Sequence, residues 1–255
     1  MITLSKRLQA VADLVKPVST MADIGCDHGF MSIYLIQSNR CEHVIAMDVN
    51  EGPLLRAKEH ILEHALQNQI ETRLSDGGKA LQLLDLGKER VQKPEAQGVI
   101  MAGMGGRLMT KILQDSKAVF GQMEQWILQP QSEPSLVRKT IRDLGFTIEE
   151  ENMVLEDGKY YGMLRAVPRS LALEETQNDS CPFHQEVLDQ YGMYLIQSGN
   201  PCFLDFLQYQ INQTKQILEN LQGQHSERTL VAKENLQEKL QLFIRLQEFT
   251  KKNDN

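Results

Sequence analysis

Short apolar runs alternate with helical segments along the first part of the chain, and this alternation restricts the fold more than any other feature. The runs have the composition of buried strands and occupy residues 21–25, 43–48, 70–75, 98–102 and 125–129. Each run precedes a segment with the periodicity of an amphipathic helix. Because alternating strands and helices pack as a parallel sheet between two helical layers, the sequence predicts an α/β fold with a doubly wound, mostly parallel sheet.

Prolines and glycines mark the ends of several predicted elements. Pro53 begins the segment PLLRAKEHILEHAL, and Pro134 begins PSLVRKTIRDLG, which ends at Gly145. Proline suits the first turn of a helix because its missing N–H has no intrahelical partner there. Residues 146–167 then contain two strand-like stretches around Asp-Gly, the strongest short-range hairpin signal. The sheet is therefore expected to end in an antiparallel hairpin.

The last third of the chain has a different pattern. A polar stretch, 169–180, predicts a linker, and a short helical segment follows at about 183–198. Apolar side chains then recur three and four residues apart, as in a coiled-coil seam with one polar position. They are Leu204, Leu207, Ile211, Thr214, Leu218 and Leu221 in the first helix, and Leu236, Leu240, Phe243, Leu246 and Phe249 in the second. We therefore predict a domain at 1–167 and a helical domain at 168–255 with an antiparallel hairpin at about 201–250.

Charge and cysteine usage narrow the class of protein. The formal charge of the 255 residues is −7, and the balanced stretch after Pro201 leaves this excess on the preceding residues. A bound polyanion must therefore meet a local basic patch. The cysteines form no C-x-x-C pair, and the first seventeen residues contain no long apolar run. These features predict reduced thiols, no metal site, no membrane span and a cytoplasmic location.

The loop after the first predicted strand carries the most informative chemistry. In MADIGCDHGF the glycines Gly25 and Gly29 are spaced G-x-x-x-G, unlike the G-x-G-x-x-G of dinucleotide sites. Asp27 stands between them, and its carboxylate would repel a pyrophosphate. The sulfonium and ammonium groups of S-adenosylmethionine are cationic and would be attracted. The loop therefore favours this methyl donor over NAD, while His28 either shares the site or supports the following helix.

Further candidates stand at the ends of the next strands. Asp48 follows Gly25 at a distance typical of an acidic residue that accepts both hydrogen bonds of a ribose diol. Asp76, which precedes Gly77, could accept from an adenine amino group. The fourth strand ends in MAGMGG, whose glycines leave the backbone bare at the edge where open α/β sheets bind ligands.

Several motifs together resemble the TrmK family, in this order along the chain: LSKRLQAVADLV, MADIGCDHGF, SDGG, IMAGMGG, ILQP and EDGKYYGML. The resemblance implies the class I methyltransferase fold, S-adenosylmethionine as cofactor, and methylation of N1 of adenine 22 in bacterial tRNA. It places donor-binding positions at Gly25, Asp27, Gly29, Asp48, Asp76, Gly77 and Gly103. The adjoining Arg7, Asp23, His28, Val49, Ala102 and Met104 complete the predicted donor site.

Two stretches depart from motifs common in that family. Members often have Ser-Asp-His-Ala-Tyr where this chain has Cys26-Asp27-His28-Gly29-Phe30, and Gln-Pro-Asn where it has Gln129-Pro130-Gln131. Both differences bear on recognition of the target base.

The expected reaction assigns roles to few side chains. N1 of adenine attacks through a lone pair and has no proton to release, so a strong general base is unnecessary. Asp27 is expected to supply negative potential, while backbone carbonyls of Gly103 and Met104 orient the base. A small-molecule methyltransferase and a non-catalytic RNA- or partner-binding module are the alternatives. The hairpin would brace tRNA, mediate self-association or simply pack on the core, and the oligomeric state stays open, with a monomer favoured.

Overall fold

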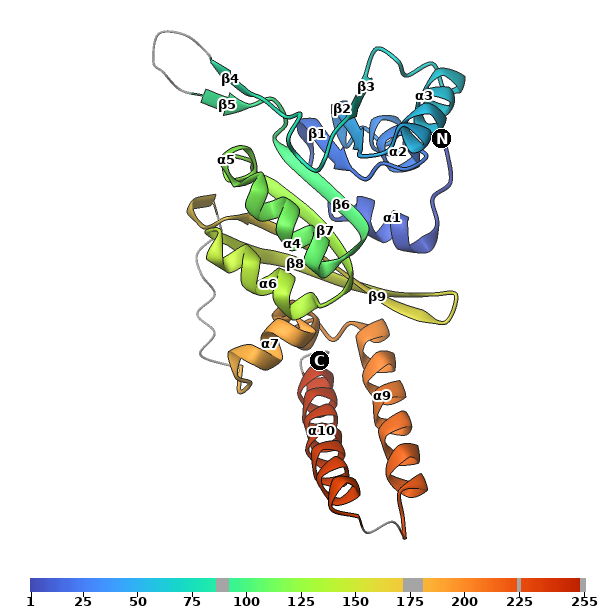
Figure 1. Cartoon of the computed structure of the whole chain (residues 1–255), viewed down its shortest axis with the longest axis vertical. Helices are drawn as coiled ribbons and strands as arrows, with labels where there is room; N and C mark the ends of the chain where they lie inside the picture. The colour runs from blue at the N-terminus through green and yellow to red at the C-terminus, as the bar shows by residue number, and fades with distance from the viewer. Residues whose placement is uncertain (86–91, 172–180, 224–225, 253–255) are drawn as a thin grey trace.

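The computed structural model describes residues 1–85, 92–171, 181–223 and 226–252 (Figure 1). Seven strands form one sheet in the order β3-β2-β1-β6-β7-β9-β8. Its strands are β1 (Val18–Ile24), β2 (Cys41–Asp48), β3 (Ile70–Leu74), β6 (Gly98–Gly105), β7 (Gln125–Ser132), β8 (Phe146–Glu156) and β9 (Lys159–Pro168). The first five of these pair in parallel, whereas β9 is antiparallel to both β7 and β8. The predicted α/β fold with a terminal antiparallel hairpin is confirmed.

Helices cover both faces of this sheet. Successive strand residues point to opposite faces and so contact opposite helical layers. Met21 packs in the apolar cluster beneath α1 (Lys6–Asp13), α2 (Phe30–Gln37) and α3 (Glu51–Glu63). The next residue, Ala22, packs on the other face. The helices there are α4 (Gly106–Asp115), α5 (Lys117–Phe120) and α6 (Pro134–Asp143). Both faces of the central strands are therefore buried, which explains their continuous apolar runs.

Two local predictions differ from the structure. The helix expected after the third strand is absent from the described residues between β3 and β6, which instead contain a small antiparallel pair, β4 (Leu83–Asp85) and β5 (Gln92–Pro94). Helix α3 begins at Glu51 rather than at Pro53. Proline is tolerated at the third helical position for the same reason as at the first, since the N–H groups of the first turn have no intrahelical partner. By contrast, Pro134 is the first residue of α6, as predicted.

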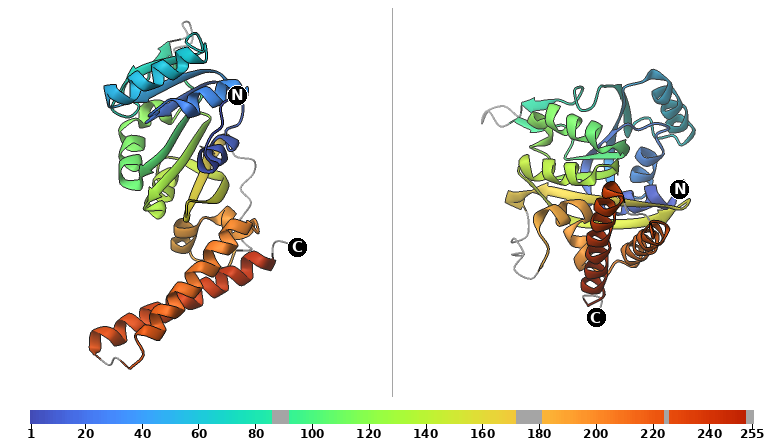
Figure 2. Two further views of the ribbon diagram at one scale, coloured as in Figure 1. Left: turned by 90° about the vertical axis from the view of Figure 1, so that its right-hand side faces the viewer. Right: turned by 60° about the horizontal axis from the view of Figure 1, so that its bottom comes forward.

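The chain ends in a helical layer below the sheet. It contains the short 3₁₀ helix η1 (Arg169–Leu171), α7 (Gln185–Tyr191), α8 (Met193–Gln197), α9 (Pro201–Asn220) and α10 (Glu227–Lys252). The rest of the predicted linker, 172–180, lies outside the described residues. Figure 2 shows α9 and α10 lying side by side and extending away from the sheet. Among the helices described, none combines the length and the apolar character that crossing a lipid bilayer requires.

The predicted seam forms the contact between α9 and α10. Leu207, Ile211 and Thr214 are buried in α9, and they face a helix in which Phe243 and Leu246 are buried. At the start of α9, however, Phe203 is buried and Leu204 is only half-buried. The seam therefore begins one residue earlier than predicted, because the large phenyl ring fills the junction with the sheet layer.

A buried ion pair within the sheet layer also makes hydrogen bonds to the helical layer. Nε of Arg138, on α6, donates to Oε1 of Glu151, on β8, at 2.8 Å. The same guanidinium donates to the carbonyl of Asp189 at 2.9 Å, and Oε2 of Glu151 accepts from the backbone N–H of Tyr194 at 3.0 Å. Neighbouring Arg142 also pairs with the Asp189 carboxylate. Two sheet-layer elements therefore hold α7 and α8 through polar contacts that exclude solvent.

Candidate active site

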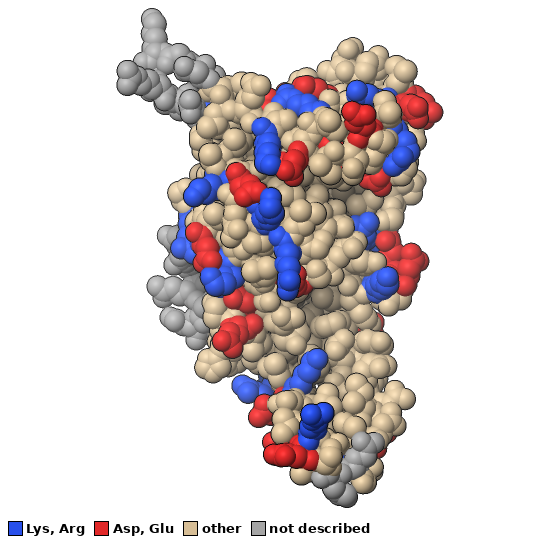
Figure 3. Space-filling view, in the orientation of Figure 1, with Lys and Arg blue, Asp and Glu red and all other residues tan. Residues whose placement is uncertain are grey.

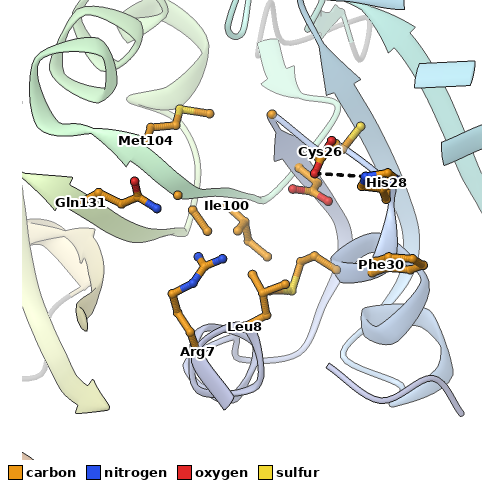
Figure 4. A pocket seen from close by; sticks show the side chains of 14 residues that line it. Arg7, Leu8, Cys26, His28, Phe30, Ile100, Met104 and Gln131 are labelled. Carbon is orange, nitrogen blue, oxygen red and sulfur yellow. Dashed lines mark ion pairs between the residues drawn. The ribbon is translucent and has the colours of Figure 1, made fainter. Parts of the chain in front are cut away.

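A cavity of about 370 Å³ opens at the carboxyl ends of β1 and β6 (Figure 4). This is the edge at which open α/β sheets bind ligands. Arg7 and Leu8 of α1 point into it from one side, and Met104 and Gln131 border it from the other. Eight of the predicted site residues line it: Arg7, Asp23, Gly25, Asp27, His28, Ala102, Gly103 and Met104.

Three residues of the loop from Gly25 to Gly29 have a left-handed backbone conformation, and these give the loop its shape. The φ angles of Gly25, Asp27 and Gly29 are 76°, 49° and 73°. A β-carbon at position 25 would lie 2.6 Å from Cε of Met104, so glycine leaves the space that the Met104 side chain occupies. The N–H groups of Gly25 and Cys26 both donate to the carbonyl of Met47. The loop is therefore anchored to β2, and its other side faces the cavity.

Asp23 is the buried carboxylate of the site. It lies near the end of β1, is 4% exposed, and accepts a 2.6 Å hydrogen bond from Oγ of Ser32 on α2. Burial raises the pKa of Asp23 from 3.8 to about 6, and the nearby Asp48 adds to the rise, while the Ser32 hydrogen bond opposes it. A negative charge is therefore costly here unless a cation lies in the cavity.

Asp27 and His28 form the exposed rim. The Asp27 side chain is 65% exposed and lies 3.7 Å from Nε2 of His28 and 3.7 Å from the guanidinium of Arg56. The His28 ring stacks on Phe30 with centroids 5.7 Å apart. His28 thus borders the cavity and packs on Phe30, the first residue of α2, whose N-cap is Gly29 without a capping side chain.

Gln129 organises the opposite wall. This fully buried side chain accepts from the backbone N–H of Gly103 at 3.1 Å and from Nη1 of Arg7 at 2.8 Å. Glu156 further accepts from the backbone N–H of Arg7. Gly103 has a φ of 80°, which turns the chain sharply at the cavity edge. Gln129 was predicted only as part of a motif, because its role depends on the pairing of β6 with β7.

The remaining predicted residues lie outside the cavity lining: Asp48, Val49, Asp76 and Gly77 follow the ends of β2 and β3, and Gly29 lies in the loop after β1. Oδ1 of Asp48 accepts from the backbone N–H of Asn50, and the adjacent Val49 is exposed. Asp76 is exposed and paired with Lys79. Gly29 is the N-cap of α2, and Gly77 packs close to Ile112. In the described part of the chain, no three His, Cys, Asp or Glu side chains are grouped to hold a metal ion.

The chain is similar in sequence to known methyltransferases. A family model described as a methyltransferase domain matches residues 4–164. The chain is 30% identical over 218 residues to the tRNA (adenine(22)-N(1))-methyltransferase of Bacillus subtilis (strain 168), covering 86% of this chain and 85% of that protein.

Solved structures give the same result over nearly the whole chain. The B. subtilis M1A22 tRNA methyltransferase TrmK superposes with a TM-score of 0.76 and 27% identity, covering 97% of this chain and 100% of that chain. Sp1610 of Streptococcus pneumoniae, in complex with S-adenosyl-L-methionine, has a TM-score of 0.71 and 25% identity, covering 99% and 100%. With a matching domain model and a relative aligned along most of both sequences, the chain belongs to the TrmK family of methyltransferases.

Proposed function

We propose that this chain transfers a methyl group from S-adenosylmethionine to N1 of adenine 22 in tRNA. The observation that carries the proposal is the acidic, glycine-walled cavity at the ends of β1 and β6, in a chain aligned over 86% of its length with a protein named for that reaction. The substrate implies that the protein acts in the cytoplasm.

The donor fits the chemistry of this cavity. Its cationic groups would offset the charge of buried Asp23 and of Asp27 at the rim. Arg7, on the opposite wall, would meet the donor carboxylate. The binding set in this proposal also contains Gly25, His28, Gly29, Ala102, Gly103 and Met104, with Asp48, Val49, Asp76 and Gly77 along the strand ends for the ribose and adenine.

The reaction requires N1 of adenine and the methyl group to be correctly positioned, and it requires no strong base. When bound, S-adenosylmethionine supplies an electrophilic methyl group. The backbone carbonyls at Gly103 and Met104 orient the adenine so that its N1 lone pair lies in line with that group. As the N1–methyl bond formed and the sulfonium–methyl bond broke, the positive charge would pass from sulfur to the purine, and Asp27 would stabilise it through negative potential at the cavity rim.

Methylation of defined tRNA tests the function directly. Labelled donor is incubated with the purified protein and an unmodified tRNA transcript, and with the same transcript carrying guanosine at position 22. Label is expected as 1-methyladenosine in the first RNA and absent from the second. Label at another nucleotide, on a small metabolite, or on neither RNA would contradict the proposal.

Replacing Asp27 with asparagine tests its catalytic role. Asparagine tolerates the left-handed backbone at this position, so the change removes charge with little strain. We expect kcat to fall about tenfold, or about 1.4 kcal/mol, since a carboxylate largely open to solvent acts through a high effective dielectric. Steady-state kinetics measure it, with Asp115→Asn, an exposed and ion-paired aspartate on α4, as the control. Full turnover with unchanged donor affinity would exclude the role.

The proposal divides the chain into a methyltransferase domain, 1–167, and a tRNA-contacting helical domain, 168–255. Helix α9 has 20 residues and so extends about 30 Å, enough to reach tRNA away from the reacting base. Figure 3 shows Lys and Arg beside Asp and Glu over α4 and α6, where Lys111–Asp115 and Lys139–Asp143 are ion pairs. A hairpin contact would supplement such a mixed surface. Size-exclusion chromatography checks this: a monomer supports it, and a dimer through α9 and α10 would favour self-association.

A further inference from the structure

A second cavity, of about 180 Å³, lies where the sheet layer meets the C-terminal helices. Gly162, on β9, borders it without contributing a side chain. Tyr160, Gly162 and Leu164 are two residues apart along β9 and therefore lie on the same face of the strand. All three line the cavity. A β-carbon at position 162 would meet only Cε of Met153, at an ordinary contact distance of 3.9 Å. The structure thus leaves room that a larger residue could fill without a clash.

Four aromatic side chains line one part of this cavity: Tyr160, Tyr191, Phe203 and Phe206. Tyr160 and Phe206 have ring centroids 5.4 Å apart, and Tyr209 lies 5.9 Å from Tyr160 on the outer side. The hydroxyl of Tyr160 donates to Oδ2 of Asp205 at 2.6 Å, which fixes the tyrosine ring. Phe203 is fully buried beneath them. The result is a rigid aromatic recess of the kind on which bases stack.

The rim of the recess is polar and adjoins the donor cavity. Gln131 and Ser132 are exposed at the end of β7, and both line the recess. Gln131 also lines the donor cavity, and its Nε2 atom lies 3.8 Å from the place that a β-carbon on Gly103 would take. Gln131 is therefore shared by the cavity proposed for the reacting adenine and by the recess.

We propose that the recess binds an unstacked tRNA base immediately next to the methylated adenine, an inference that rests on the proposed function. An apolar cavity of about 150 Å³ holds a benzene ring, so this recess has room for one base. Because it shares only Gln131 with the donor cavity, its occupant is the neighbour and not the reacting base. The amide of Gln131 and the hydroxyl of Ser132 are placed to hydrogen-bond the edge of that base.

Filling the recess is the first test. In Gly162→Val, a β-branched side chain suits the strand and occupies the space, so the thermal midpoint should be unchanged or higher. The KM for tRNA is expected to rise about tenfold, with kcat and the KM for S-adenosylmethionine unchanged. Phe206→Leu, which removes an aromatic wall, should raise the same KM. Phe249→Leu, at a half-buried phenylalanine outside the recess, is the matched control and should leave the KM for tRNA unchanged.

A tRNA lacking one base separates this role from a structural one. Transcripts abasic on the 5′ or the 3′ side of the target adenine are compared with one abasic in the anticodon loop. Removal of the base on one of these two sides should raise the KM for tRNA about tenfold for the wild-type protein. The same change should raise it less than twofold for Gly162→Val. The inference is wrong if the wild-type protein methylates tRNA but Gly162→Val has the same KM for it. It is also wrong if the missing base raises the KM of Gly162→Val by as large a factor as it raises that of the wild-type protein. If the wild-type protein methylates no tRNA, the proposed function itself fails.

Discussion

Replacing Glu151 with glutamine is expected to lower the free energy of unfolding by about 3–5 kcal/mol. The Glu151 side chain is fully buried and that of Arg138 is 7% exposed, so the change leaves a guanidinium without its counter-charge in a site closed to water. Breaking a buried pair from one side typically costs this much, because the remaining charge keeps its desolvation penalty. The contacts of Arg138 with the carbonyl of Asp189 compensate only in part.

Urea unfolding measures this effect with two probes. Trp126, the single tryptophan, is fully buried in the sheet layer, so its fluorescence reports that layer, while circular dichroism reports the helices as well. In the variant, the circular dichroism change should begin at lower urea than the fluorescence change, since both members of the pair hydrogen-bond the helical layer. Lys139→Gln, which breaks an exposed pair with Asp143 on the same helix, should stay within about 0.5 kcal/mol of wild type. A Glu151→Gln variant as stable as this control would show that the pair contributes little.

The buried pair also connects stability with the proposed RNA site. Arg138 lines the aromatic recess, and the α7 and α8 segment that it holds contributes Tyr191 and Leu195 to the same recess. Buried polar contacts therefore add to the apolar packing between the sheet layer and the helical layer. Such contacts have strict geometry, whereas apolar packing alone would tolerate sliding.

Most of the fold could be predicted because the sheet imposes its pattern on the sequence. Strands buried on both faces require continuous apolar runs, such as the one from Val99 to Met101, and these runs are visible without any structure. The pair β4 and β5 could not be found in this way, since LLD and QKP have neither an apolar run nor clear alternation. Similarly, the burial of Phe203 instead of Leu204 depends on how α9 meets the sheet layer.

The candidate site was only partly predictable for a related reason. Asp27 and its flanking glycines are local signals, because the charge and the left-handed turns belong to one loop. Gln129 is different: its side chain is recruited by Gly103, on a neighbouring strand, and by Arg7, on a helix at the start of the chain. The sequence contains no local sign of such a junction. The aromatic recess is likewise invisible until β9 and α9 come together.

Replacing Asp23 with asparagine is expected to raise the free energy of unfolding at pH 8 while weakening the binding of S-adenosylmethionine. The pKa of Asp23 is about 6 in the folded protein and 3.8 in the reference state. A difference of about two pKa units corresponds to up to about 3 kcal/mol, by which the ionised carboxylate destabilises the protein without ligand. Asparagine removes this cost and can still accept the hydrogen bond from Ser32.

The pH dependence has a definite sign. Between about pH 4 and pH 6 the folded state binds more protons at Asp23 than the unfolded state does, so this group destabilises the fold less as the pH falls through about 6. The stability gained by Asp23→Asn should therefore be full above about pH 7 and vanish below about pH 4. Urea unfolding across this range measures it, with Asp27→Asn as the control, whose exposed side chain should change stability by no more than about 0.5 kcal/mol.

Donor binding should follow the opposite trend, because a cationic ligand favours the ionised carboxylate. In the wild-type protein the affinity for S-adenosylmethionine is expected to fall as the pH drops through about 6, whereas in Asp23→Asn it should be at least tenfold weaker at pH 8 and nearly independent of pH. Isothermal titration calorimetry at several pH values resolves both trends. A variant that is more stable yet binds the donor with wild-type affinity would separate the burial of Asp23 from any role in the site. A variant with both changes would show that this carboxylate lowers the stability of the ligand-free fold and attracts the methyl donor.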